Sequence, residues 1–259
     1  MKILVLNPFA GEAKEVERCK SVARADTEIV FDNIADVYPL NYVTYIYYRH
    51  RCADAVVDRV VRAQEQGFDA VFISCCYDPG LWEAREVVDI PVTGAFESGA
   101  HYVNAISQRY SVISTEPKTS HCYWELAQLY GTAGKLASVR PINVSARDSY
   151  PEVTRPQIVV DRTLEVARKC VEDDGAEAIL MGCTLQSCPL TVAGAGDAMG
   201  APIIDPVLIG LKQTELMVEL RRVGLPTLSR YGTWQKPPAD EVARLRQRAG
   251  KEMQVTVKA

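Results

Sequence analysis

The sequence predicts an α/β fold with two pseudo-symmetric domains, each built on a doubly wound parallel sheet. Two observations support this prediction. Short apolar segments alternate with stretches of helical apolar spacing, which is typical of a parallel sheet covered by helices on both faces. The same order of strands and turns also recurs about 108 residues later in the chain, which indicates two similar halves.

The predicted strands are short apolar runs bounded by polar or turn-forming residues. They are Ile3–Leu6, Ala70–Ser74, Pro91–Gly94, Tyr110–Ser114, Ala178–Gly182 and Ile203–Asp205. Between them, Ala53–Gln66 and Asp161–Asp174 carry apolar residues at helical spacing, and Gly67 and Gly175 follow as helix stops. The chain is therefore expected to alternate strand and helix through both halves.

The repeat is clearest around two cysteines. The segment Gly67–Cys76 aligns with Gly175–Thr184, so Cys75 and Cys183 occupy equivalent positions 108 residues apart. Prolines beside two further pairs of strands repeat with offsets of 109 and 111 residues. We assign residues 1–90 together with 206–259 to the first domain, and residues 91–205 to the second.

Both cysteines stand where a strand ends and a helix is expected to begin. The carboxyl ends of the strands in an open α/β sheet line the ligand crevice, so two facing halves would bring Cys75 and Cys183 to one shared cleft, the expected active site. A thiolate and a thiol on opposite sides of a carbon next to a carbonyl can remove a proton and return one. A helix N-terminus lowers the pKa of a thiol toward neutrality. The alternative is two buried thiols at strand ends, but a packing role gives no reason for cysteine at both equivalent positions.

Polar residues accompany these strand ends and are expected to bind the substrate. Asn7, Ser114 and Thr115 end the first strand of each half. Asp78 and Thr184 follow the two cysteines, where backbone N–H groups of a helix start favour an anion. Turn and cap formation is the alternative role for such residues.

Composition excludes several classes of function. The net charge of −4 and the pI of about 5.5 argue against nucleic acid as a partner. No apolar run is long enough to span a membrane, and the start of the chain does not resemble a signal peptide, so we expect a cytoplasmic protein. Its eight cysteines show no CxxC spacing and its three histidines are scattered. We therefore expect free thiols, no metal and no cofactor.

These motifs resemble the aspartate/glutamate racemase superfamily, and most closely its hydantoin and allantoin racemase branch. The similarity runs from Lys2 to about Leu220. It is strongest in Ile73–Leu81, Pro91–Gly94, Tyr110–Thr115, Gly175–Glu177 and Gly182–Thr184. The resemblance implies two pseudo-symmetric α/β domains, a small-molecule substrate and a cofactor-free two-base mechanism. It also places the family's catalytic cysteines on Cys75 and Cys183. Alternation along the strand independently places Cys76 on the opposite side, where we expect a packing role.

The sequence departs from the family pattern where the first strand ends. The family usually continues as Asn-Pro-Asn-Thr, which helps to hold polar groups of the ligand. Asn7 and Pro8 remain, and we expect both to contribute to the substrate site, but Phe9 and Ala10 replace the amide and the hydroxyl. The segment Tyr38–Tyr48 is also more aromatic than the family pattern. These changes favour a substrate with a more apolar or aromatic side group.

The favoured activity is therefore racemisation or epimerisation of a hydantoin, allantoin or amino-acid derivative. Two related enzymes remain as alternatives. A maleate isomerase-like protein would use a cysteine as nucleophile, and an arylmalonate decarboxylase-like protein would need only the second cysteine. A catalytically silent small-molecule binding protein is the alternative from another class. Ser229–Ala259 follows the region of resemblance and is expected to form a surface appendage or a subunit contact, including a short strand at residues 255–257, in a homo-oligomer.

Overall fold

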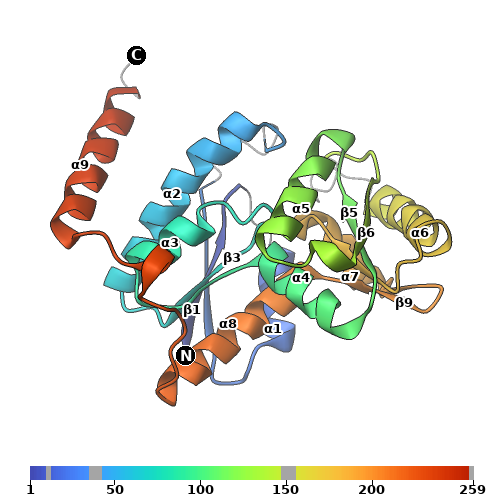
Figure 1. Ribbon diagram of the computed structural model, residues 1–259, viewed down its shortest axis with the longest axis horizontal. Coiled ribbons are helices and arrows are strands. Elements are labelled where there is room, and N and C mark those ends of the chain that lie inside the picture. The colour runs from blue at the N-terminus through green and yellow to red at the C-terminus, as the bar shows by residue number, and fades with distance from the viewer. Residues whose placement is uncertain (10–12, 35–42, 147–155, 257–259) are drawn as a thin grey trace.

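The chain forms two sheets that lie side by side, each covered by helices (Figure 1). The computed structural model describes residues 1–9, 13–34, 43–146 and 156–256. The strand orders are β2-β1-β3-β4 in the first sheet and β6-β5-β7-β9-β8 in the second. All pairs are parallel except β8 with β9. The predicted α/β fold with two mainly parallel sheets is confirmed.

The first sheet has its strands in the order expected for a doubly wound fold. Its strands are β1 (Lys2–Asn7), β2 (Glu28–Asn33), β3 (Ala70–Ile73) and β4 (Val92–Gly94). The helices that follow them are α1 (Ala13–Val22), α2 (Ile46–Glu65), α3 (Leu81–Val87) and α4 (Ala95–Ile106). Helices α2 and α3 pack against each other, while α1 and α4 both pack against the later helix α8 (Pro206–Arg222).

The second sheet repeats this arrangement. Its strands are β5 (Tyr110–Ser114), β6 (Leu136–Pro141), β7 (Ala178–Met181), β8 (Asp197–Ala198) and β9 (Ala201–Ile204). Its helices are α5 (Pro117–Leu129), α6 (Pro156–Glu172) and α7 (Thr184–Ala193). Short 3₁₀ turns lie at Ala133–Lys135 and Gly232–Trp234. The orders β2-β1-β3-β4 and β6-β5-β7-β9 therefore correspond strand by strand, as the sequence repeat implies.

Strand β4 extends the first sheet beyond the boundary expected at residue 90. Val92 and Gly94 lie in parallel register with Val71 and Ile73 of β3, and the side chain of Arg85 donates to the carbonyl of Val92. Helix α8 packs on β3 and β4 as well as on α1 and α4. The exact division of the chain into domains stays a prediction.

Three hydrophobic clusters hold these layers together. Along β1, Leu4 and Leu6 face the cluster under α2, whereas Ile3 and Val5 face a second cluster, as the alternation of a strand requires. The second cluster contains residues of both sheets, and the third lies under α6 on the far face of the second sheet. The two halves thus share a core beneath the ends of their strands. Close contact of α8 with this core depends on Gly210, because a Cβ there would lie 2.2 Å from the ring of Phe72.

The C-terminal segment forms a helix, α9 (Ala239–Thr256), that projects from the first half (Figure 1). The expected strand at residues 255–257 is wrong for residues 255 and 256, because the helix continues through them; Val257 lies outside the described residues. Arg246, near the middle of α9, forms ion pairs with Asp58 and Glu65 of α2, which tie the two helices together. In the part of the chain that the structure describes, no helix is long and apolar enough to cross a membrane.

Candidate active site

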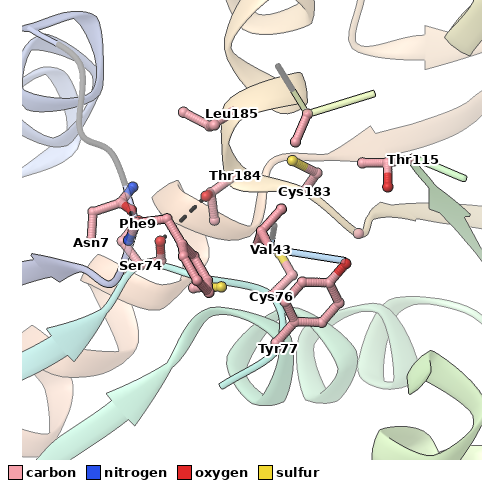
Figure 2. A pocket seen from close by; sticks show the side chains of 13 residues that line it. Asn7, Phe9, Val43, Ser74, Cys76, Tyr77, Thr115, Cys183, Thr184 and Leu185 are labelled. Carbon is pink, nitrogen blue, oxygen red and sulfur yellow. Dashed lines mark hydrogen bonds between the residues drawn. The ribbon is translucent and has the colours of Figure 1, made fainter. Parts of the chain in front are cut away.

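The candidate site is a cavity at the carboxyl ends of strands from both sheets (Figure 2). Asn7 ends β1, Thr115 follows β5, and the residues after β3 and β7 complete the walls. Its volume is about 40 Å³, well below the roughly 300 Å³ or more of a typical small-molecule site. Binding a ring-bearing substrate therefore requires the walls to move apart.

Cys75 and Cys183 both line this one cavity, one from each half. Cys75 lies two residues beyond β3, and its side chain is 7% exposed. Burial raises the pKa of its thiol well above the ordinary value, while the backbone N–H of Tyr77 opposes this rise. The two thiols that the repeat marked thus meet in one cavity, and their catalytic roles stay a prediction.

Cys183 is the N-cap residue of α7. Burial raises the pKa of its thiol, and the backbone N–H groups of Gln186 and Leu185 lower it by smaller amounts. The helix N-terminus therefore acts in the expected direction, but burial has the larger effect. The expectation of a pKa lowered toward neutrality is wrong for both cysteines, because desolvation disfavours the thiolate.

Cys76 also lines the cavity, contrary to its expected position on the far side of the strand. Strand β3 ends at Ile73, so strict alternation no longer applies at Cys76. The Cys76 thiol is 3.6 Å from the carbonyl oxygen of Met181 and donates to it. Its side chain also belongs to the shared core of the two sheets, in agreement with a packing role.

Three of the predicted polar residues line the cavity: Asn7, Thr115 and Thr184. The side-chain oxygen of Asn7 accepts from the backbone N–H of Phe9 at 3.1 Å, which fixes the turn after β1. The hydroxyl of Thr184 donates across the cavity to the carbonyl of Ser74 at 3.3 Å, shown as the dashed line in Figure 2. This bond joins the loop after β7 to the loop after β3.

The other predicted polar residues lie outside the cavity lining. Asp78 accepts hydrogen bonds from the backbone N–H groups of Phe96 and Glu97 and from the Tyr130 hydroxyl, so it holds the start of α4. A Cβ on Gly94 would lie 2.5 Å from this carboxyl, so the close approach depends on glycine. Burial raises the pKa of Asp78 to about 7.

Ser114 and Pro8 have structural contacts, and their predicted contact with substrate stays a prediction. The hydroxyl of Ser114 is 2.8 Å from that of Ser120 on α5. The carbonyl of Pro8 accepts from the Cys52 thiol on α2 at 3.6 Å. Both residues thus support the loops that carry Asn7 and Thr115.

Five apolar or aromatic side chains also line the cavity: Phe9, Val43, Tyr77, Ala146 and Leu185. The Tyr77 ring stacks on that of Tyr123 at 5.9 Å, and the guanidinium of Arg49 lies 4.6 Å from the Tyr77 ring centre. Phe9 follows the first strand and Val43 belongs to the segment Tyr38–Tyr48, so both come from the places where the sequence departs from the family pattern. Tyr45 and Tyr47 of the aromatic segment are exposed, whereas Ala10, Tyr38 and Tyr42 lie outside the described residues.

Sequence reasoning missed two charged residues beneath this site, Glu15 and Arg18 on α1. Both are buried, and Cys19 and Val22 continue the same helical face. The sequence feature that could have revealed them is this i, i+3, i+4, i+7 spacing, which marks the buried face of a helix and here includes two charged residues.

Among the described residues, no three His, Cys, Asp or Glu side chains gather as a metal site would require.

Comparison with known proteins identifies relatives along most of the chain. Residues 3–214 match the family model of Asp/Glu/hydantoin racemases. A hydantoin racemase from Pseudomonas sp. (strain NS671) is 32% identical over 227 residues, which cover 85% of this chain and 87% of that protein. A hydantoin racemase from Paenarthrobacter aurescens is 29% identical over 92% of this chain and 98% of that protein. The structure of an allantoin racemase from Klebsiella pneumoniae is similar with a TM-score of 0.77 and 25% identity, covering 92% of this chain and 94% of that chain.

Proposed function

The chain belongs to the Asp/Glu/hydantoin racemase family, and from this membership we propose that it is a cofactor-independent racemase in which Cys75 and Cys183 exchange protons with the substrate. The observation that carries the mechanism is the position of the two thiols. They lie on one cavity, at equivalent strand ends of the two halves. A carbon held between them would have one sulfur on each face.

In the proposed reaction, the thiolate of one cysteine removes the proton from the carbon next to the carbonyl. The C–H electron pair moves into an enolate, and the thiol of the other cysteine returns a proton to the opposite face. The first cysteine is now a thiol and the second a thiolate, so the reverse reaction starts from this state. Burial raises the pKa of both thiols, which makes each thiolate scarce and correspondingly strong as a base.

The proposed substrate is a hydantoin, an allantoin-like ureide or an amino-acid derivative that carries an apolar side group. Asn7, Thr115 and Thr184 are the cavity residues suited to its polar atoms. The side group would lie against Phe9, Val43 and other apolar residues of the wall. The helix N-terminus at Cys183 supports the negative charge that develops on the enolate.

The mechanism is tested by three cysteine variants and α-proton exchange in deuterated water. Cys75→Ser and Cys183→Ser should each lower racemisation by at least about 10²-fold, because serine is far too weak a base at neutral pH. Each should still exchange the proton of one enantiomer, and the two variants should prefer opposite enantiomers. Cys76→Ser should remain largely active, as should Cys170→Ser, a control at a buried thiol of α6 itself.

Full racemisation by Cys75→Ser, with loss only in Cys76→Ser, would show that the neighbouring cysteine is the base. Racemisation that survives in both Cys75→Ser and Cys183→Ser would remove the two-thiol mechanism. A substrate that forms a covalent bond to either sulfur would instead support a maleate isomerase-like reaction. Binding without exchange in the unmodified protein would support the silent binding protein.

We also propose that the protein is cytoplasmic and forms a homo-oligomer. All eight cysteines are free thiols, which suits a reducing compartment. Light scattering of the purified chain tests the oligomer, and a single-chain mass at all concentrations would contradict it. Fractionation of cells that produce the protein tests its location.

A further inference from the structure

Helix α1 buries two opposite charges beneath the cavity. Glu15 is 1% exposed and Arg18 is 6% exposed, and they lie about one turn apart on the same helical face. Removing a carboxylate and a guanidinium from water costs several kcal/mol per ion unless their hydrogen bonds are replaced. Their hydrogen bonds therefore indicate what the two side chains hold in place.

Glu15 holds residues next to Cys75. One of its carboxyl oxygens accepts from the Ser74 hydroxyl, and the other accepts from the side-chain amide of Asn7 at 3.1 Å. Ser74 directly precedes Cys75, and both Ser74 and Asn7 line the cavity. Glu15 thus fixes the ends of β1 and β3 in the first half.

Arg18 reaches from the first half to the helix that begins at Cys183. Its guanidinium donates to the carbonyl of Thr184 at 3.0 Å and to the Ser187 hydroxyl at 3.0 Å, both in the first turn of α7. It also forms an ion pair with Asp205 at 2.5 Å, and Asp205 accepts in turn from Ser187 at 2.9 Å. The first turn of α7 is therefore held by a charge that belongs to α1.

We propose that Glu15 and Arg18 are positioning residues that hold the two cysteine loops from below and that act as an opposed pair of charges on the reactivity of Cys183. This inference rests on the proposed function, which makes Cys183 one of the two bases. Arg18 favours the Cys183 thiolate by attraction, and Glu15 disfavours it by repulsion. In this proposal the two cysteines contact the substrate, whereas Glu15 and Arg18 act only through them.

The electrostatic effects of the two side chains on Cys183 have opposite signs. The Arg18 guanidinium lowers the pKa of Cys183, whereas the Glu15 carboxylate raises it. Burial raises the pKa of Glu15 to about 7, so this carboxyl is ionised wherever the Cys183 thiol begins to ionise. Further titratable groups around this pair come from several elements: Cys19 of α1, Cys75, Cys76 and Tyr77 after β3, Tyr123 of α5, Cys188 of α7 and Asp205 before α8.

The test is the pH dependence of Cys183 alkylation in the full chain without substrate. Iodoacetamide is added at each pH, and mass spectrometry of digested protein gives the rate at Cys183 alone. Glu15→Gln should move the midpoint to lower pH, and Arg18→Gln should move it to higher pH, each by at least about half a pH unit, since a neighbouring charge favours or disfavours the thiolate. Arg18→Lys keeps the charge, so its midpoint should lie close to that of the unmodified protein.

Two exposed residues of the same helix supply matched controls. Glu17→Gln and Lys20→Gln change the same charges on the solvent face of α1, and their midpoints should equal that of the unmodified protein. A variant that merely loosens the cavity admits water to the Cys183 thiol and lowers the midpoint, because burial is the main cause of its raised pKa. Loosening would therefore move Glu15→Gln and Arg18→Gln in the same direction, whereas the charge effect moves them in opposite directions. If Arg18→Gln does not fold, Glu15→Gln is compared with Glu15→Asp, which keeps the charge. A midpoint lowered only in Glu15→Gln supports the charge effect, and a midpoint lowered equally in both refutes it.

Midpoints of Glu15→Gln and Arg18→Gln that move in the same direction, or that match the controls, would overturn the proposal. The experiment needs no turnover, so its outcome is separate from that of the proposed function. Opposite shifts in a protein whose Cys183→Ser variant still racemises substrate would support the charge pair and refute the two-thiol mechanism. Absent shifts in a protein that needs both cysteines would do the reverse.

Discussion

The buried carboxyl of Glu15 should make the stability of the protein fall as the pH rises through neutrality. Its pKa rises from 4.5 to about 7 in the folded chain because burial disfavours the charged form. Between these two values the unfolded chain loses the proton while the folded chain keeps it. The folded state is therefore favoured at low pH, and this advantage is lost as the pH passes through 7. Each pH unit in that window is worth about 1.4 kcal/mol, so the total from pH 4 to pH 8 is about 3 kcal/mol.

Glu15→Gln removes this dependence with little change in shape. The glutamine oxygen can still accept from Asn7, and its amide can donate to the Ser74 hydroxyl, which rotates to accept. The free energy of unfolding, measured by urea at pH 4 and at pH 8, should fall less for the variant than for the unmodified protein by about 3 kcal/mol. Subtracting the two proteins cancels contributions of other buried groups such as Asp78.

The exposed Glu17→Gln variant is the control, and its two free energies should follow those of the unmodified protein. A variant that loses as much stability between pH 4 and pH 8 as the unmodified protein would refute the reasoning. That result would mean that Glu15 keeps an ordinary pKa in the folded chain, and therefore that water or a conformational change solvates it.

Three further results are expected. Gly210→Ala should destabilise the protein by about 1–3 kcal/mol, since its Cβ would lie 2.2 Å from the Phe72 ring, whereas Gly196→Ala has no neighbour within 4 Å and should leave the urea midpoint nearly unchanged. Hydantoins with an aromatic or branched apolar side group should racemise with higher kcat/KM than aspartate, and equal or better turnover of aspartate in the same polarimetric assay would contradict the apolar wall. Arg49→Met should raise the rate of Cys183 alkylation, because Arg49 joins α2 to α5 above Tyr77; an unchanged rate would show that this contact does not limit access.

The central strands were predictable from the sequence because both of their faces are buried. Residues 70–73 of β3 and 178–181 of β7 are apolar throughout, as expected for a strand between two layers of helices. The strands β2 and β6 were not predicted. They lie at sheet edges and are mostly half-buried, so polar residues such as Asp32 and Arg140 interrupt their apolar pattern. Their position depends on hydrogen bonds to β1 and β5, which no local pattern records.

The two cysteines of the candidate site were predictable because the sequence repeat marked their positions. The roles of the residues around them depend on tertiary contacts, which the sequence pattern does not record. Cys75 and Cys183 were found because equivalent positions in two halves carried the same unusual residue. Asp78 was expected to bind the substrate; its carboxyl lies outside the cavity lining and holds the start of α4, a contact that no local pattern indicated. Glu15 and Arg18 were missed because a charge on a helix ordinarily faces water. Only the approach of α1 to the loops of both halves gives these two side chains buried partners.

The two halves are symmetric in topology but not in the surroundings of their thiols. Cys183 is the N-cap residue of α7, and two backbone N–H groups favour its thiolate. Cys75 has one such group, and α3 begins only after Gly80, whose left-handed conformation closes the loop. A racemase acting on a substrate with one stereocentre has an equilibrium constant of one, so kcat/KM must be equal for the two enantiomers whatever the difference between the bases. The difference between the two thiols can therefore appear only in kcat and in KM taken separately, which can differ between the enantiomers while their ratio does not. The charges of α1 can change these separate values, but they cannot change the final ratio of the two enantiomers.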